Sequence, residues 1–388
     1  MKQNTTYKQT ELGLIPDDWE VKKLGEVIKL GNGKDYKHLN SGNIPVYGTG
    51  GIITYVDKYL FNGKSVGIGR KGSIDKPVLL DGKFWTVDTL FYVKEFFNSD
   101  IDFIYNSFLK IPWLKYNEAT GLPSLSQNII NNLKIPLPPL PEQKKIADCL
   151  STWDVAIEKQ SALINALTER KKALMQQLLT GKKRLPGFSE EWKEVKMGDL
   201  FEKINRKNEE GNTNVVTISA QRGFVKQTDF FNKSVASETL DNYSLIYHGE
   251  FCYNKSYSNG YPLGATKRLI AFEKAVVTTL YICFKIKDQK KSNGSFFEQF
   301  FEANSLDRSL IKIAQEGGRA HGLLNVSLSD FFNIKIKLPP IEEQTAIAEI
   351  LAAADRELQL QKEKLAQLQA QKKGLMQVLL TGKKRLIN

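Results

Sequence analysis

The chain has 388 residues, enough for two domains with hydrophobic cores of their own. Its 55 Lys and Arg residues against 43 Asp and Glu residues give a net charge of +12, which favours a polyanionic partner. Three distant Cys and three scattered His argue against a disulfide framework and a metal site. The polar start and the lack of an apolar run of about 18 residues predict a cytoplasmic protein without a membrane span.

The first predicted element is a globular domain over residues 1–133. Short β-type runs, such as Ser65–Ile68 and Phe91–Val93, alternate with turns rich in Gly, Asn and Asp. These patterns predict a domain of mixed α and β structure.

A glycine-rich motif lies inside this domain, at residues 67–72 (GIGRKG). Its spacing matches a dinucleotide-binding loop, but Pro77 and a turn at Asp81-Gly82 follow where that site requires a helix, so we reject a cofactor site. Two interpretations stay open. The motif is either a tight hairpin that presents Arg70 and Lys71 to a phosphate backbone, or an ordinary β-turn.

Residues 134–185 predict one long helix. Pro138-Pro139 ends an extended segment, and Pro141 and Glu142 suit the first helical turn. From Ile146 onwards seam positions recur at alternating steps of four and three, which is the rule of a coiled coil. Gly181 suits a left-handed helix end. About 40 helical residues give a rod of about 60 Å.

Residues 186–333 predict a second mixed domain, with β-type runs such as Val276–Ile286. Trp192 with Met197-Gly198 repeats Trp19 with Leu24-Gly25 from the first domain. Apart from these residues near the domain boundaries, the sequences of the two domains show little similarity.

Residues 334–388 repeat the helical segment at an offset of 201 residues. Of the 54 positions aligned from Leu133 and Ile334, 26 are identical, including the whole run LLTGKKRL. The chain is therefore a duplicated two-part module with pseudo-twofold character. An apolar stripe along one face of a helix also suits a core helix of a globular domain. Two helices with matched apolar stripes favour a helix pair instead. We expect the pair to be antiparallel, with Gln160 close to Gln361.

The predicted seam of this pair contains polar residues as well as apolar ones. Gln160 and Gln361, together with Lys171 and Lys372, interrupt both stripes in register, a device that fixes register and partner number. The other seam positions are Ile146, Leu150, Trp153, Ile157, Ile164, Leu167, Leu174 and Leu178 in the first helix, and Ile347, Leu351, Leu358, Leu365, Leu368, Leu375 and Leu379 in the second.

Charge is concentrated in the helices, because residues 134–185 and 334–388 carry +9 of the net +12. A DNA-binding face of either domain must therefore be local. Polar, aromatic and basic loop residues supply candidates, although each also suits a solvated loop. The candidates are Lys34, Tyr36, Tyr47, Thr49, Arg70, Lys71, Ser73 and Ser124 in the first domain, and Gln221, Arg222, Tyr253, Asn254, Lys255, Tyr257, Arg319 and His321 in the second. The glycine-rich stretches Thr120–Ser126 and Glu316–Ser327 lie at equivalent positions, which makes them the better candidates.

Catalytic motifs are not found. Pro16-Asp17 and Glu20-Val21-Lys22 resemble a nuclease motif only superficially, because they crowd into seven residues. Neither a phosphate-binding GxxxxGK[ST] motif nor an NPPY-like methyltransferase motif occurs. We therefore expect no catalytic residues in this chain.

Two domains of unlike sequence alternate with two helical repeats. The repeats begin with LPPLPEQ and LPPIEEQ, and both end in LLTGKKRL. This organisation resembles the specificity subunit of type I restriction-modification systems. The resemblance implies two α/β target recognition domains, at 1–133 and 186–333. Each would read one half of a bipartite double-stranded DNA site. It implies antiparallel helices, at 134–185 and 334–388, that set the half-site spacing.

The resemblance also implies partners. Two methyltransferase subunits dock on such a scaffold, and motor-nuclease subunits add to them. S-adenosylmethionine and ATP are then expected on the partners, and none on this chain. Two rival classes remain: a coiled-coil adaptor that does not read DNA, and a nuclease or fused methyltransferase, whose motifs are missing.

Overall fold

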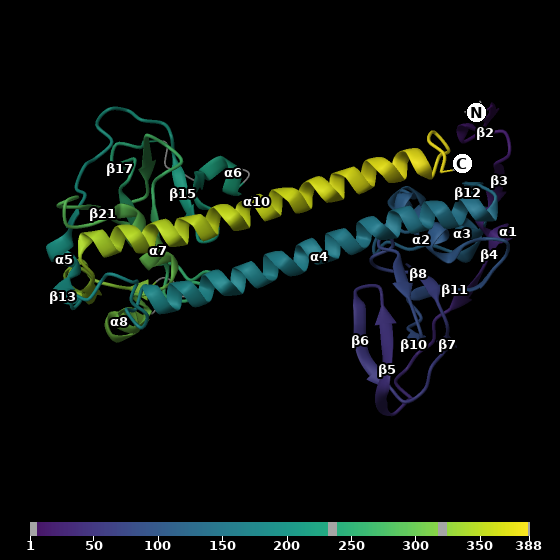
Figure 1. Cartoon of the computed structure of the whole chain (residues 1–388), viewed down its shortest axis with the longest axis horizontal. Helices are drawn as coiled ribbons and strands as arrows, with labels where there is room; N and C mark the ends of the chain where they lie inside the picture. Colours follow the sequence, from purple (N-terminus) through teal and green to yellow (C-terminus); the bar gives the residue numbers. More distant parts are fainter. Residues whose placement is uncertain (1–5, 232–238, 317–323, 387–388) are drawn as a thin grey trace. The chain divides into compact units, whose positions relative to one another are not determined.

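The structure is a computed structural model that describes residues 6–231, 239–316 and 324–386. The chain forms two compact units, Met1–Ala162 with Lys362–Asn388, and Leu163–Gln361. The long helices α4 (Leu140–Leu178) and α10 (Ile341–Leu379) each contribute residues to both units (Figure 1). The boundaries expected from the sequence, at residues 133, 185 and 333, stay predictions, because packing groups each domain with parts of both helices.

The first unit holds the N-terminal domain. Its elements, besides the helix parts, are β1 (Tyr7–Thr10), β2 (Gly13–Pro16), β3 (Glu20–Lys23), α1 (Leu24–Val27), β4 (Ile28–Asn32), β5 (Ser41–Gly48), β6 (Gly51–Val56), β7 (Phe61–Asn62), β8 (Ser65–Gly69), β9 (Val78–Leu80), β10 (Lys83–Thr86), β11 (Leu90–Phe96), α2 (Ile101–Lys110), the 3-10 helix η1 (Trp113–Tyr116), α3 (Gln127–Asn132) and β12 (Lys134–Leu137). They build two four-stranded sheets, ordered β4-β11-β8-β9 and β6-β5-β10-β7. Strand β12 pairs with β3 and leads directly into α4.

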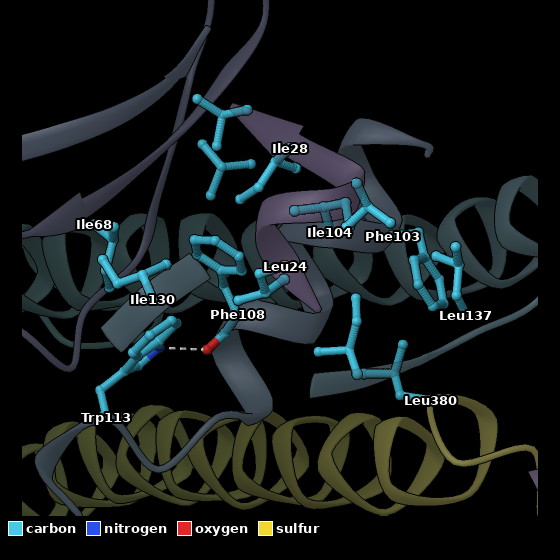
Figure 2. Packing of buried hydrophobic residues seen from close by; sticks show 14 of the residues in the cluster. Leu24, Ile28, Ile68, Phe103, Ile104, Phe108, Trp113, Ile130, Leu137 and Leu380 are labelled. Carbon is cyan, nitrogen blue, oxygen red and sulfur yellow. Dashed lines mark hydrogen bonds between the residues drawn. The ribbon is translucent and has the colours of Figure 1, made fainter. Parts of the chain in front are cut away.

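The main core of the first unit joins this domain to the helix ends. Leu24, Phe108 and Trp113 are almost completely buried in it, and the indole Nε1 of Trp113 donates to the Phe108 carbonyl at 2.7 Å. Figure 2 shows Leu380, from the segment after α10, reaching the same cluster. Leu150 of α4 also belongs to it. The end of α10 is thus tied to the first domain by apolar burial.

The second unit holds the other domain. Its elements, besides the helix parts, are β13 (Lys193–Lys196), α5 (Met197–Leu200), β14 (Phe201–Lys203), β15 (Val216–Ser219), β16 (Gly223–Lys226), α6 (Gln227–Phe231), β17 (Ser244–Tyr247), β18 (Phe251–Asn254), β19 (Ala265–Arg268), β20 (Lys274–Val277), β21 (Ile282–Ile286), α7 (Gly294–Glu302), α8 (Asp307–Ile313), β22 (Gln315–Glu316), β23 (Leu324–Asn325), α9 (Leu328–Asn333) and β24 (Lys335–Leu338). The run expected as continuous β structure at 276–286 is divided between β20 and β21, because a turn closes at Tyr281 with its N–H on the Thr278 carbonyl. The mixed α and β class is confirmed.

Phenylalanine dominates the larger core of the second unit. The rings of Phe201 and Phe297 lie 4.7 Å apart in an edge-to-face arrangement, which is favourable for aromatic pairs. Cys252 and Cys283 face each other across β18 and β21 in a separate small core, as free packing cysteines. Cys149 is half-buried on α4.

The duplication extends into the domains, where the sequences cannot be aligned. The second unit contains a sheet ordered β14-β21-β18-β19, the same order as β4-β11-β8-β9 in the first. In both sheets the neighbouring strands are antiparallel. Strand β18 therefore corresponds to β8, and β21 corresponds to β11.

In the first unit the start of α4 packs beside the end of α10. The carboxylate of Glu142, which is buried, accepts from Arg385 at 3.1 and 2.6 Å and from the Trp19 indole at 2.9 Å. Further along, Lys372 pairs with Asp154 at 2.5 Å. Residue numbers rise along one helix as they fall along the other, so this part of the pair is antiparallel.

The second unit repeats the arrangement with the helices exchanged. Glu343 accepts from Arg184 at 2.7 and 2.7 Å and from the Trp192 indole at 3.0 Å. Lys171 pairs with Asp355. The expected antiparallel pairing is thus confirmed within each unit, and the two lysines that interrupt the seam are neutralised by the other helix. The expected closeness of Gln160 and Gln361 stays a prediction.

The helix ends and the seam follow the sequence pattern. Gly181 and Gly382 adopt φ angles of +68° and +71°, as expected for left-handed end residues. A Cβ on Gly382 would lie 2.3 Å from the Pro16 ring, so the close approach of the N-terminal hairpin also requires glycine there. Every predicted seam residue is buried or half-buried.

Candidate nucleic-acid interface

The glycine-rich motif of the first domain is a turn at the end of β8. Strand β8 pairs with β9, and residues 70–77 between the two strands contain no helix. A Cβ on Gly69 would lie 2.3 Å from the Ser73 carbonyl oxygen, and Gly72 has φ +93°. Glycine is therefore required at both positions for the chain to reverse so tightly.

This turn lies against the second glycine-rich stretch of the domain. The Leu125 N–H donates to the Arg70 carbonyl at 2.9 Å, and the Gly72 N–H donates to the Pro123 carbonyl at 2.8 Å. Lys71 and Ser124 form an isolated β-bridge. The structure thus brings together two segments that the sequence flagged separately, 69–73 and 120–126.

The side chains at this junction have the chemistry of a phosphate-binding surface. Arg70 and Lys71 are exposed, and the Arg70 guanidinium lies 5.9 Å from the Phe91 ring centroid. A pocket of 270 Å³ opens beside them, with Ser124 and Gln127 in its wall. Cations beside hydroxyl and amide groups suit DNA, whose backbone attracts the charges and whose base edges accept hydrogen bonds.

Other first-domain candidates meet at residues 86–89, which comprise the last residue of β10 and the connection from β10 to β11. The Thr86 carbonyl accepts from the Lys34 N–H at 2.8 Å, and the Val87 N–H donates to the Tyr47 carbonyl at 3.0 Å. The Thr89 carbonyl accepts from the Arg70 N–H at 2.8 Å. These bonds gather the three candidate segments around one connection.

Three more candidates of the first domain take different positions. The Thr49 hydroxyl lies 3.3 Å from where a Cβ of Gly72 would be, so Thr49 borders the turn that also contains Ser73. Tyr36 instead packs against a small core beneath β5, with its side chain half-buried. Packing is its principal contact in this structure.

The equivalent turn in the second domain follows β18. The Leu324 N–H donates to the Lys255 carbonyl at 3.1 Å, just as the Leu125 N–H donates to the Arg70 carbonyl in the first domain. Lys255 thus occupies the position of Arg70. Next to it the Asn254 side chain accepts from the Ser256 N–H at 3.0 Å, and Tyr257 is 65% exposed.

Gln221 and Arg222 lie on the turn between β15 and β16. The Gln221 side chain donates to the Asn259 carbonyl at 2.9 Å, so this turn rests on the loop that follows Lys255. The Arg222 guanidinium is exposed and lies 5.9 Å from the Phe230 ring centroid. Both residues line a pocket of 270 Å³.

Tyr253 is not part of a surface. Only 1% of it is exposed, its ring stacks on Phe331 at 5.2 Å, and its hydroxyl donates to the Leu263 carbonyl at 2.7 Å. Burial raises the pKa of this phenol above its usual value. Its selection as a DNA contact was wrong, because alternate residues of β18 face the core. Arg319 and His321 lie outside the described residues.

The sequence did not reveal that Arg70 and Lys255 are equivalent. The two turns lie at different distances from the helical repeats, so no constant offset links them. The role of residues 86–89 was not predicted from the sequence either. The usable signal was the β-type run that precedes each turn, because it marks the end of a strand where side chains reach the surface.

Two negative findings concern the residues that the structure describes. No group of His, Cys, Asp and Glu side chains has the geometry to hold a metal ion. Helices with the length and apolar character needed to cross a bilayer are also missing from this part of the chain.

Comparison with known proteins agrees with this architecture. A family described as "Type I restriction modification DNA specificity domain" matches residues 16–169 and 189–370, one match for each copy of the module. The MjaVIII specificity subunit of Methanocaldococcus jannaschii, named as part of a type I restriction enzyme, is 26% identical over 96% of this chain and 95% of its own length.

A second relative from that organism, named as a putative MjaX specificity subunit, is 26% identical over 98% of this chain and 97% of its own length. The crystal structure of a type I S subunit from M. genitalium superposes with a TM-score of 0.59, at 14% identity, over 98% of this chain and 97% of that one. The chain belongs to the family of specificity subunits of type I restriction-modification systems.

Proposed function

We propose that this chain is the non-catalytic targeting subunit of its system and reads a bipartite double-stranded DNA site, one half with each unit. The observation that carries the proposal is the paired geometry of the two turns. Arg70 and Lys255 follow corresponding strands of sheets with the same order, and each is backed by the segment that precedes a short helix. Two equivalent readers with different side chains suit a site with two unlike halves.

The scaffold supports a proposal about partners. An antiparallel helix pair in which each unit repeats the other offers equivalent surfaces twice, which suits two copies of one methyltransferase subunit. Motor-nuclease subunits would join that complex. S-adenosylmethionine and ATP would then bind to the partners, and the whole assembly would act in the cytoplasm.

Residue roles follow from position. Arg70, Lys71 and Ser124 are proposed contacts of the first unit, with Lys34, Tyr47, Thr49 and Ser73 around them. In the second unit Lys255, Asn254 and Tyr257 are proposed contacts, with Gln221 and Arg222 beside them. Arginine and asparagine pair with base edges, whereas lysine neutralises phosphates.

Methyl transfer tests the proposal. The purified chain, mixed with labelled S-adenosylmethionine and DNA, is expected to transfer no methyl group. Addition of a methyltransferase subunit of the same system should produce methylation at one bipartite sequence with a fixed spacer. Methyl transfer by the chain alone would contradict a non-catalytic role. A complex whose DNA binding is weak, indifferent to sequence and insensitive to salt would favour the adaptor instead.

A further inference from the structure

The connection between β18 and β19 in the second unit is a tight hairpin. Its tip is Asn259-Gly260, and Ser258 and Tyr261 exchange backbone hydrogen bonds of 3.2 and 2.8 Å across it. Gly260 has φ +80°, the left-handed conformation that glycine adopts at the second central position of a type II turn. At the base a Cβ on Gly264 would lie 2.3 Å from the Asn254 carbonyl oxygen. The tip and the base of the hairpin are thus both tightly turned, and the hairpin carries Tyr257, which is 65% exposed.

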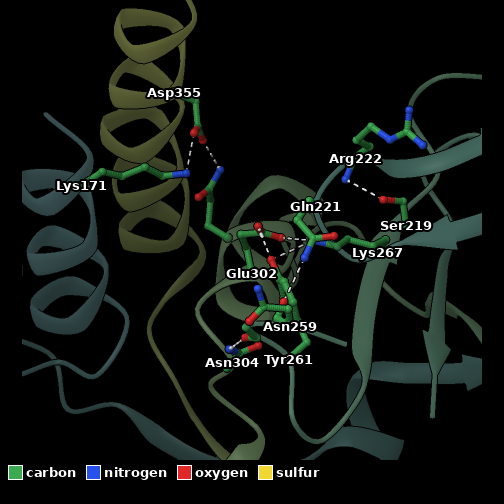
Figure 3. A network of polar contacts seen from close by, with 12 residues as sticks. Lys171, Ser219, Gln221, Arg222, Asn259, Tyr261, Lys267, Glu302, Asn304 and Asp355 are labelled. Carbon is green, nitrogen blue, oxygen red and sulfur yellow. Dashed lines mark hydrogen bonds and ion pairs between the residues drawn. The ribbon is translucent and has the colours of Figure 1, made fainter. Parts of the chain in front are cut away.

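Side chains from α7 and the residues after it hold this hairpin. The Tyr261 hydroxyl donates to Glu302 at 2.6 Å and accepts from Lys267 at 3.1 Å, and Lys267 forms an ion pair with the same Glu302. Asn304, with φ +54°, donates from its amide to the Gly260 carbonyl at 2.9 Å. Figure 3 shows Glu302, Lys267 and Tyr261 close together beside Asn259 and Asn304, and Gln221 reaches the Asn259 carbonyl separately.

Helix α7 is in turn fixed to α10 within the same unit. The Gln299 amide donates to Asp355 at 2.8 Å, and Asp355 also pairs with Lys171. At the start of α7 the Asn293 N–H donates to the Gln344 side chain at 2.9 Å. A polar chain thus runs from the helix pair through α7 to the hairpin tip.

The charge of Lys267 is already satisfied. Only 9% of its side chain is exposed, and Glu302 neutralises it. The ammonium also lies 4.6 Å from the Tyr261 ring centroid. A cation held in this way has no counterion to release on DNA, unlike an exposed phosphate-binding lysine.

We propose that α7 is a strut that holds the β18–β19 hairpin in its DNA-reading position, and that Tyr261, Lys267 and Glu302 are positioning residues that do not touch DNA. This inference rests on the proposed function. Discrimination of the second half-site would then depend on residues that make no contact with DNA.

The direct test releases the hairpin without changing charge. The double variant Tyr261→Phe with Asn304→Gly removes the two hydrogen bonds that reach residues 260 and 261 from the α7 side, and it keeps the Lys267–Glu302 ion pair at the base. Glycine tolerates the positive φ at residue 304. In the complex with its methyltransferase partner, this variant should discriminate matched from mismatched second half-sites about tenfold less well than wild type. Discrimination at the first half-site should not change.

Salt dependence separates positioning from contact. Lys267→Met should lose discrimination at the second half-site but keep the wild-type slope of log affinity against log salt, whereas loss of a phosphate contact lowers that slope by about one. Lys285→Met is the control, because Lys285 of β21 pairs with Glu202 of β14 at 3.0 Å on the same sheet, toward the end of β21 that lies away from the hairpin. That control should match wild type in both measurements.

A general loss of stability is excluded by a compensated variant. Lys267→Met with Glu302→Leu and Tyr261→Phe leaves neither an unpaired charge nor an unpaired hydroxyl, so the unfolding midpoint should recover while discrimination stays low. Discrimination that recovers together with the midpoint would overturn the proposal, as would wild-type discrimination in the released hairpin or a slope reduced by Lys267→Met. A wild-type complex without preference at either half-site would instead refute the proposed function itself.

Discussion

In both units the glutamine near the start of a long helix accepts a hydrogen bond from the N-cap residue of a domain helix. The Gln143 side chain accepts from the Asp100 N–H at 2.8 Å, and Gln344 accepts from the Asn293 N–H at 2.9 Å. Asp100 and Asn293 cap α2 and α7 with their own side chains. The two domains are therefore attached to the helical repeats by the same hydrogen bond, from a helix N-cap to a glutamine of the repeat.

The units differ six residues after these N-cap residues, at Asn106 and Gln299. In the second unit Gln299 reaches Asp355 on α10, whereas Asn106, one methylene shorter, donates to the Asp102 carbonyl of its own helix at 2.8 Å. Contacts made by the repeats are thus duplicated, and contacts made by the domains vary. Such a division lets the reading surfaces diverge while the framework keeps its geometry.

The largest expected effect on stability comes from the buried glutamates, Glu343 and Glu142, that bind Arg184 and Arg385. Glu343→Gln leaves Arg184 without its carboxylate and should destabilise the second unit by about 3 kcal/mol. Glu142→Gln should cost the first unit about 1 to 2 kcal/mol less, because Asp18 still pairs with Arg385, at 2.8 and 2.7 Å. Native-state hydrogen exchange in β12 and β24 measures each unit separately.

Asp18→Asn provides the control for that comparison. Combined with Glu142→Gln, it should raise the cost in the first unit to the level of Glu343→Gln. Equal costs for the two single variants would show that Asp18 has no part in the difference.

The ion pairs of the helix seam should show a smaller difference. Asp355→Ala breaks bonds to both Lys171 and Gln299, whereas Asp154→Ala breaks the bond to Lys372. We expect Asp355→Ala to cost about 1 kcal/mol more, the usual contribution of one hydrogen bond. A double-mutant cycle with Gln299→Ala measures the coupling by urea unfolding, and a coupling energy of zero would contradict the link.

The smallest effect concerns pH. Burial raises the pKa of Glu298 on α7 above its usual 4.5, although Arg268 opposes the shift. The folded state therefore binds this proton more tightly than the unfolded state, so stability from this group is greatest at low pH and falls as pH rises through 4.5 and the folded pKa. Glu298→Gln should remove that fall.

The first unit offers the matched control. Tyr105 occupies the equivalent position, five residues after the helix cap, and does not titrate in the acid range. Tyr105→Phe should leave the pH profile of unfolding between about 4 and 6 unchanged. A profile that Glu298→Gln does not flatten would refute the assignment.

The helical repeats were predictable from the sequence because their signals are local. Heptad spacing located both helices, Gly181 marked one end, and the interruptions at Lys171 and Lys372 were visible as polar seam positions. Their partners, Asp355 and Asp154, were not identified, because that pairing depends on the register between two distant segments.

The domains were less predictable because their fold depends on pairing between distant strands. Arg70 and the segment around Ser124 were both flagged, but only the folded sheet places them together. Tyr253 was misassigned, because sequence cannot show which face of β18 meets Phe331. The strut formed by α7 was not anticipated at all, since its bonds join residues separated by up to 56 positions.

A crossed half-site experiment tests the central claim most directly. Binding of the partner-loaded complex to DNA with substitutions in either half-site is measured for wild type, Arg70→Ala and Lys255→Ala. Arg70→Ala should weaken binding and relax preference in one half-site by about 1 to 3 kcal/mol. Lys255→Ala should reduce the salt slope by about one, and any change in its preference should fall in the other half-site. A change in preference at the same half-site for both variants would contradict separate reading by the two units.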